Sequence, residues 1–409
     1  MNSKNILSQI REDWLLYTVF FMTSIASVMF ELYAILFWML VCKEFGRSIS
    51  SIGKLLPFIL YITFSTLLGL AITGFPADKA VVQIGQLIVY MCIYYAFMLH
   101  YKGRLNHVYE VYVKFAYILA LVGIIQYVAA LLFGLKLFYI FDSLRESALI
   151  EGGVRAKAWV GEPANFALYL VPALAYNCFR YGLFNIRTLF LMFAGWLAFT
   201  PIFQLSLVLI VCYYFYRYRL KATKGIILIL FFLVGSSLMQ SRLDFDRSDY
   251  INTNNEQKTS ETFQYLTANF TELESANLST YSLLKNLRIA FMADNRITGT
   301  GIGTHGYSHD KFYHSSFVYS MLNQWDAYSL GTRIFSELGI VGIIVFLYFF
   351  IKYFNRNNII NISIVFYFIF AFLRGGHYTI SGAQFFLMMY LFTSKFKMSK
   401  SQMSDNYIS

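Results

Sequence analysis

Three clusters of polar residues stand out in a chain of 409 residues in which only 13% of the side chains are charged. The first cluster combines Arg155 and Lys157 with Glu162, which directly precedes Pro163. Proline suits the first position of a helix, so Glu162 would lie at a helix N-terminus, where the helix dipole favours a carboxylate. These residue types could bind an anion and exchange a proton. The structural alternative is an ordinary first-turn acid beside solvated loop charges.

The second cluster begins with Arg288 and continues into a glycine-rich segment with Gly299, Gly301 and Gly303. Glycines at this spacing can turn backbone N–H groups toward an anion such as phosphate. No strand precedes the segment, so a dinucleotide-binding fold is not supported. Arg288 favours anion binding, because a guanidinium group binds phosphate bidentately. The alternative is a flexible turn.

The third cluster is rich in histidine and is followed by further polar residues near the ends of apolar runs. Its members are His305, His309, Asp310 and His314, then Asp326, Tyr328 and Arg333, and finally Arg374 in a short turn. A general base or a hydrogen-bonding role for one histidine fits this pattern. A metal site is the alternative, but no HExxH or other defined ligand spacing is present. Surface histidines would also explain two of the three.

The composition requires most of the chain to lie in a membrane. Hydrophobic residues make up 58% of the sequence, and charged residues reach about half of the share usual in soluble proteins. The net charge of +11 does not indicate nucleic-acid binding, because the basic residues form short groups between apolar runs. The chain is therefore expected to be an all-α polytopic membrane protein.

Ten apolar runs are candidates for membrane-spanning helices: 14–42, 55–74, 82–99, 112–134, 162–179, 188–216, 225–240, 334–353, 358–373 and 378–394. A helix needs about 20 apolar residues to cross the bilayer. The runs 14–42 and 188–216 are longer than that, and the second contains Thr200-Pro201. Each could be one long tilted helix or a pair of short helices.

Basic residues favour the paired arrangement, which gives about 12 spans. With both termini in the cytoplasm, that side receives 19 of the 33 Lys and Arg but five of the 22 Asp and Glu, as the positive-inside rule requires. The expected parts are an N-terminal transmembrane bundle over 1–240 with an external loop at 135–161, a periplasmic loop or cap over 241–333, and C-terminal helices with a cytoplasmic tail over 334–409.

The large external loop has helical patterning of its own. Apolar residues recur at helical spacing in 260–270 and again at Leu283, Leu284, Leu287 and Phe291. Two amphipathic helices are expected, with the second starting after Ser279 or Thr280. They would lie on the outer membrane surface or cap the bundle.

The polar motifs, in their order along the chain and in their expected place on the outer side of the membrane, resemble those of the O-antigen polymerase (Wzy-type) and O-antigen ligase superfamily. The resemblance rests on Arg155 with Gly161-Glu162-Pro163, on Gly299-Thr-Gly301-Ile-Gly303, and on the run from Arg333 through Glu337 to Gly342. Its motifs cover about 50 residues, and the topology covers most of the chain. The Glu-Pro form of the first motif favours a polymerase. So does Trp325-Asp326-Ala-Tyr328 in the place where ligases have a His-Asn pair.

The resemblance implies a metal-independent, inverting glycosyltransferase of the GT-C type, without a cofactor. It would join oligosaccharide repeat units carried on undecaprenyl diphosphate at the periplasmic face of the bacterial inner membrane. The implied partners are these lipid-linked substrates, membrane lipid and a chain-length regulator. The alternatives are a ligase that transfers glycan to lipid A-core and a flippase for the same lipid-linked units; a flippase should carry its charges deep within the bundle.

The resemblance also assigns roles to the polar clusters. Positive charge must stabilise the leaving diphosphate, and a base must take the proton of the acceptor hydroxyl. Arg155 and Arg288 are the expected cations, with Glu162 as the first choice of base and His305 or His309 as the second. The residues expected to bind the diphosphate or the glycan are Lys157, Gly301, Gly303, His314, Asp326, Tyr328, Arg333 and Arg374.

Overall fold

The computed structural model describes residues 3–25, 28–135, 155–218, 269–274, 276, 278–317, 319–379 and 382–395, and every regular element within them is helical. The elements are α1 (Ser3–Ser24), α2 (Val28–Val41), α3 (Phe45–Thr73), α4 (Asp78–His100), the short η1 (Lys102–Arg104), α5 (Leu105–Phe133), α7 (Pro163–Tyr181), α8 (Ile186–Trp196), α9 (Pro201–Tyr218), α12 (Phe270–Leu273), α13 (Leu278–Met292), α14 (His305–Phe312), α15 (Leu330–Tyr353), α16 (Ile359–Leu373) and α17 (Ala383–Thr393).

Four helical stretches in the described part of the chain are long and apolar enough to cross a membrane. They are α3, α4, the continuous stretch Lys102–Phe133 and α15. Shorter apolar helices accompany them, including α8, α16 and α17. The expected all-helical class is therefore confirmed, whereas the number of 12 spans stays a prediction. The run 225–240 lies outside the described residues.

Both of the overlong apolar runs are divided into two helices, as the paired arrangement predicts. The run 14–42 contains α1 and α2, which pack against each other. The run 188–216 is interrupted between Trp196 and Pro201, where Phe199 has a φ of 46°. Pro201 then opens α9, because a proline at a helix start loses no intrahelical hydrogen bond.

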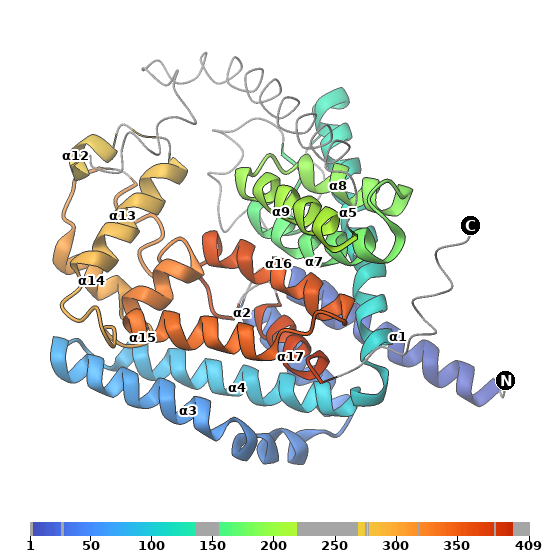
Figure 1. The fold of residues 1–409 in the computed structure, drawn as a ribbon, viewed down its shortest axis with the longest axis horizontal. Helices are drawn as coiled ribbons and strands as arrows, with labels where there is room; N and C mark the ends of the chain where they lie inside the picture. Colours follow the sequence, from blue (N-terminus) through green and yellow to red (C-terminus); the bar gives the residue numbers. More distant parts are fainter. Residues whose placement is uncertain are drawn as a thin grey trace.

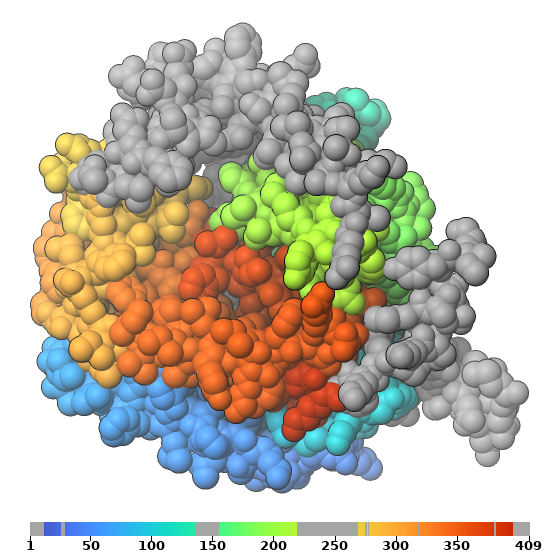
Figure 2. Space-filling model, in the orientation of Figure 1, coloured from blue at the N-terminus to red at the C-terminus, as the bar shows by residue number. Residues whose placement is uncertain are grey.

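Polar contacts between neighbouring helices gather at the two opposite ends of the long helix α4. Two ion pairs, Glu12–Arg104 and Glu110–Arg180, and a hydrogen bond between Glu44 and His100 lie together at one end. The other end of α4 begins at Asp78, whose carboxylate accepts a 2.5 Å hydrogen bond from Tyr307 of α14. Since a helix of 23 residues is about 34 Å long, α14 lies far from the ion-paired end. Figure 1 shows α14 near the blue ends of α3 and α4, with α12 farther away, and in Figure 2 the yellow and orange surface adjoins the blue one at the left.

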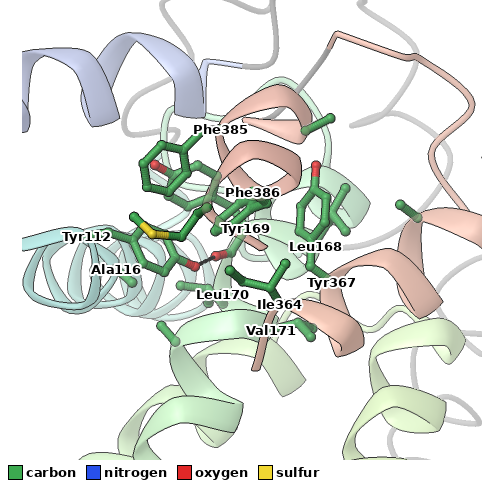
Figure 3. Packing of buried hydrophobic residues seen from close by; sticks show 14 of the residues in the cluster. Tyr112, Ala116, Leu168, Tyr169, Leu170, Val171, Ile364, Tyr367, Phe385 and Phe386 are labelled. Atoms are coloured by element: carbon green, nitrogen blue, oxygen red, sulfur yellow. Dashed lines mark hydrogen bonds between the residues drawn. The ribbon is translucent and has the colours of Figure 1, made fainter. Parts of the chain in front are cut away.

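An aromatic core holds the long helices together. α7 is buried along almost its whole length and packs against α16. Tyr112 of α5 donates a 2.5 Å hydrogen bond to the backbone carbonyl of Tyr169 in α7, and Phe386 of α17 packs edge-on against Tyr112 (Figure 3). A ring of this size removes much apolar surface from water while its hydroxyl finds a buried acceptor.

The helices α12–α14 form a small cap with its own core around Leu273, Tyr281 and Tyr313. The apolar face predicted for α13 was wrong in part: Leu284 is buried, but Phe291 is 51% exposed. The buried face instead includes Lys285 and Asn286. The reason is that α13 packs against α14 and α15 rather than lying flat on an apolar surface. The first predicted helix falls mostly in 260–268, outside the described residues.

Candidate functional site

A pocket of about 210 Å³ lies where the cap meets the long helices. Four parts of the chain form its walls: α4, the glycine-rich segment, the residues before and within α15, and the connection between α16 and α17. The lining residues are Lys79, Val82, Gln83, Gly303, Trp325, Asp326, Arg333 and His377. Two cations, a carboxylate and an imidazole thus come together around one cavity.

Arg333 is the most deeply held cation of the pocket, with 2% of its surface exposed. Its guanidinium donates to Glu337 Oε1 (3.1 Å), to the carbonyl of Gly376 (3.1 Å) and to Gln83 Oε1 (3.3 Å). The Tyr378 ring lies 4.5 Å from its Cζ, and the Tyr378 hydroxyl donates to the other oxygen of Glu337 (2.9 Å). Arg333 is therefore oriented by several partners, and its guanidinium forms a buried ion pair with the Glu337 carboxylate.

The α4 wall supplies two further polar side chains to the pocket. Lys79 is exposed, and its ammonium lies 5.4 Å from the centre of the Trp325 ring. Gln83 Nε2 is buried and has no hydrogen-bond acceptor among the described residues. A buried amide donor without a partner costs about 1–3 kcal/mol, so an acceptor atom of a ligand in the pocket would stabilise the protein.

Asp326 lies in a strained segment that precedes α15. Ala327 and Tyr328 have positive φ values of 56° and 67°, which cost non-glycine residues of order 1–3 kcal/mol each. Gly376 makes the packing possible: a Cβ there would lie 1.5 Å from the Asp326 carbonyl oxygen. Strain of this kind is concentrated at functional sites, which favours a function for the segment.

Arg374 and His377 come from the connection between α16 and α17. Arg374 stacks on the ring of Tyr328, with its Cζ 4.0 Å from the ring centre. His377 lines the pocket, and its Nδ1 lies 3.2 Å from the hydroxyl of Thr379. Burial, with the positive charge of Arg333, lowers the pKa of His377 to about 4, although Asp326 opposes the shift. His377 is therefore neutral at pH 7.

The histidines of the third cluster do not meet as metal ligands. Among the described residues, no three His, Cys, Asp or Glu side chains are placed to hold a metal ion. His305 is fully buried between Asn286 and Ser336, and burial, with nearby positive charge, lowers its pKa to about 3. His309 is buried as well, and its Nε2 donates to the carbonyl of Ser320 (3.0 Å). His314 is exposed.

The glycine-rich segment packs between helices and does not present a row of free N–H groups. The amides of Thr300 and Gly301 donate to carbonyls of α15, at 3.1 and 2.9 Å, and the amide of Ile302 donates to the hydroxyl of Thr66 (3.2 Å). Gly301 has a φ of 106°, which a residue with a side chain rarely adopts. Gly303 lines the pocket. These three amides therefore do not form the predicted anion cradle.

The first cluster lies apart from the pocket. Arg155 donates to the carbonyls of Ala198 (3.0 Å) and Phe199 (2.7 Å) and so fixes its segment to the turn between α8 and α9. Lys157 is 4% exposed. Glu162 directly precedes α7, and its carbonyl accepts the first hydrogen bond of that helix. None of the three lines the pocket.

Arg288 is not a pocket residue either: its Cζ lies 5.8 Å from the ring centre of Phe270 in α12. The predicted residues that the structure brings together in the pocket are Gly303, Asp326 and Arg333. Sequence reasoning missed Lys79 and Gln83. Lys79 carried a detectable signal, because it is the single Lys or Arg between Lys54 and Lys102 and shortly precedes an apolar run.

The fold and the pocket together define a class: an all-helical protein with helices of membrane-spanning length and a polar pocket at one end of them. No known protein-family pattern matches the chain, and no curated protein sequence matches it.

Proposed function

We propose that this protein is a polysaccharide polymerase of the O-antigen type. It would join undecaprenyl-diphosphate-linked oligosaccharide repeat units by inverting glycosyl transfer at the outer face of the bacterial inner membrane. The observation that carries the proposal is the pocket itself. Lys79 and Arg333 stand at the ends of α4 and α15, two helices long enough to span a membrane, and Asp326 lies beside them.

The chemistry of the transfer matches these groups. The acceptor hydroxyl oxygen attacks the anomeric carbon of the donor, and the bond from that carbon to the diphosphate oxygen breaks with its electron pair. The departing diphosphate gains negative charge, which fixed cations in a pocket stabilise. Lys79 and Arg333 supply that charge, and Gln83 Nε2 supplies a further donor. The proton of the acceptor hydroxyl goes to a base in the same pocket.

The proposed orientation places the pocket in the periplasm and both termini in the cytoplasm. The distribution of basic residues supports it, because the ion-paired end of the helices carries the basic turns that the positive-inside rule assigns to the cytoplasm. In this orientation the diphosphate of a lipid carrier would lie level with the helix ends, and its glycan would extend toward the cap. A chain-length regulator is the proposed protein partner.

Substitution of Lys79 by glutamine tests the proposal, because Lys79 is exposed and its loss should leave the fold intact. Purified protein in lipid nanodiscs is incubated with a synthetic undecaprenyl-diphosphate-linked repeat unit, and products are separated by chain length. Wild-type protein should form a ladder of longer glycans. Lys79→Gln should slow elongation by about tenfold or more, as expected for loss of a charged hydrogen bond.

The matched control is Lys311→Gln, which removes an exposed lysine that pairs with Asp294 on the cap. It should elongate at the wild-type rate. A wild-type protein that moves glycan only onto lipid A-core would be a ligase, and one that moves a labelled lipid across liposomes without a new glycosidic bond would be a flippase. Either outcome would overturn the polymerase proposal.

A further inference from the structure

Asp326 is the one carboxylate among the residues that line the pocket. Both of its oxygens are held: Oδ1 accepts the backbone N–H of Tyr328 (3.1 Å), and Oδ2 accepts the amide of Asn323 (3.0 Å). Each carboxylate oxygen has a second lone pair that these bonds do not use. The side chain is therefore fixed in direction while it keeps accepting capacity toward the pocket.

A buried series of hydrogen bonds begins on α15 and enters the cap. Ser336 Oγ lies 2.8 Å from His305 Nδ1, and His305 Nε2 lies 3.0 Å from Asn286 Oδ1. Because an amide oxygen can only accept, His305 Nε2 must donate to it. A neutral imidazole then has Nδ1 as an acceptor, so Ser336 donates its hydroxyl proton to it. The amide nitrogen of Asn286 donates to the backbone carbonyl of Ser282 (2.7 Å) and makes a longer contact with the Ser282 hydroxyl (3.4 Å), which continues the series.

The second half of the series reaches the pocket. Ser282 Oγ donates to Asn323 Oδ1 (2.7 Å), and Asn323 Nδ2 donates to Asp326. All five bonds thus donate in one direction, from α15 toward the Asp326 carboxylate. We call this series the polar chain, and its members are Ser336, His305, Asn286, Ser282, Asn323 and Asp326.

A chain of donors that all point the same way has a physical consequence. Each bond polarises the next, so the donor at the end of the chain is strengthened and the negative charge of its acceptor is stabilised. His305 must stay neutral with its proton on Nε2, since a second proton on Nδ1 would reverse the first bond. Its burial and the positive charges of Arg333 and Lys285 favour this neutral form.

We propose that Asp326 is the catalytic base of the transfer and that the polar chain positions it. This inference rests on the proposed function. In the reaction the acceptor hydroxyl oxygen forms the new bond to the anomeric carbon, its proton passes to Asp326, and the electron pair of the broken bond leaves with the diphosphate. His305 acts through other residues and is a positioning residue.

The charged and titratable groups that act on Asp326 come from several elements: Lys79 on α4, Lys285 on α13, Arg333 on α15 and His377 before α17. A test of the polar chain must leave these groups unchanged. Ser282 meets that condition, because it is uncharged, buried and in the middle of the chain.

The experiment compares three variants in the nanodisc elongation assay. Asp326→Asn should lower kcat by about 10²–10⁴-fold, as expected for loss of a general base. Ser282→Ala should lower kcat by about three- to tenfold. It should also move the acid limb of the pH profile of kcat/KM to higher pH, because the carboxylate loses support for its charge. Ser308→Ala is the matched control: its hydroxyl is buried in the cap without a hydrogen-bond partner among the described residues, and its profile should not shift.

The outcomes separate this inference from the proposed function. If wild-type protein elongates glycans but Asp326→Asn does so too, the base is another residue and the inference fails alone. An unshifted profile for Ser282→Ala would likewise overturn the polar chain. Nitrogen-15 NMR of His305 tests the chain without any activity: at pH 5 we expect a neutral ring with its proton on Nε2. A charged ring, or a proton on Nδ1, would contradict the chain even if no glycan is formed.

Discussion

Substitution of Arg333 by methionine tests the charge network behind the pocket. The guanidinium donates to Glu337, Gly376 and Gln83 and stacks on Tyr378. Methionine keeps the apolar stem but leaves Glu337, with none of its surface exposed, as a buried carboxylate. The Tyr378 hydroxyl is then its remaining donor among the described residues. Removal of one partner from a buried ion pair costs about 3–5 kcal/mol, so we expect a loss of stability of that size.

The double variant Arg333→Met/Glu337→Gln decides whether the pair is the cause. It removes the uncompensated charge, so it should regain about 1–3 kcal/mol relative to Arg333→Met. Thermal unfolding of the purified proteins in detergent, followed by tryptophan fluorescence, should rank wild type first, the double variant second and Arg333→Met last. A double variant less stable than Arg333→Met would refute the reasoning, because Glu337 would then be held by something other than Arg333.

Two further predictions concern α15 and the cap. Gly339→Ala should destabilise the protein and increase protease cleavage near 297–301. Gly339 has a φ of 66°, and a Cβ there would lie 2.2 Å from the Ile297 carbonyl oxygen. The second prediction uses Lys285, whose pKa burial lowers to about 8, against the charge of Asp326. An unfolded lysine has a pKa of about 10.4, so between these values the unfolded state binds more protons and the free energy of unfolding should rise with pH. Urea unfolding at pH 7.5 and 9.5 measures this rise, which Lys285→Met should abolish.

The sequence predicts the helical class and both helix breaks because these features depend on composition, on the length of apolar runs and on the positions of proline and basic residues. Apolar composition decides whether a helix can lie in lipid, and Pro201 marks the start of α9 wherever it packs. The break after α1 has no proline or glycine in Thr23-Ser-Ile-Ala-Ser27. It was predicted from length and from the side on which basic residues fall, which are also properties of the sequence alone.

The candidate site was predicted only in part because its contacts join distant segments. Lys285 was not singled out in the sequence, yet in the structure its ammonium donates to the carbonyls of Ser320 (2.6 Å) and Leu322 (2.8 Å). The segment 319–323, which contacts α13, creates that environment, and no spacing within α13 reveals it. Arg155 was expected in an anion site for its residue type, but backbone carbonyls between α8 and α9 take its donors.

The pocket divides its chemistry between the long helices and the segments that cover them. Its cations, Lys79 and Arg333, belong to α4 and α15, whereas Asp326 and His377 come from the connections beyond the helix ends. A lipid-linked donor would need this division, because its diphosphate stays at the membrane surface and its glycan extends into water. As the proposed base, Asp326 in the connection before α15 could meet an acceptor hydroxyl that arrives from the aqueous side. The polar chain then links Asp326 to Ser336 of α15, the helix that also carries Arg333.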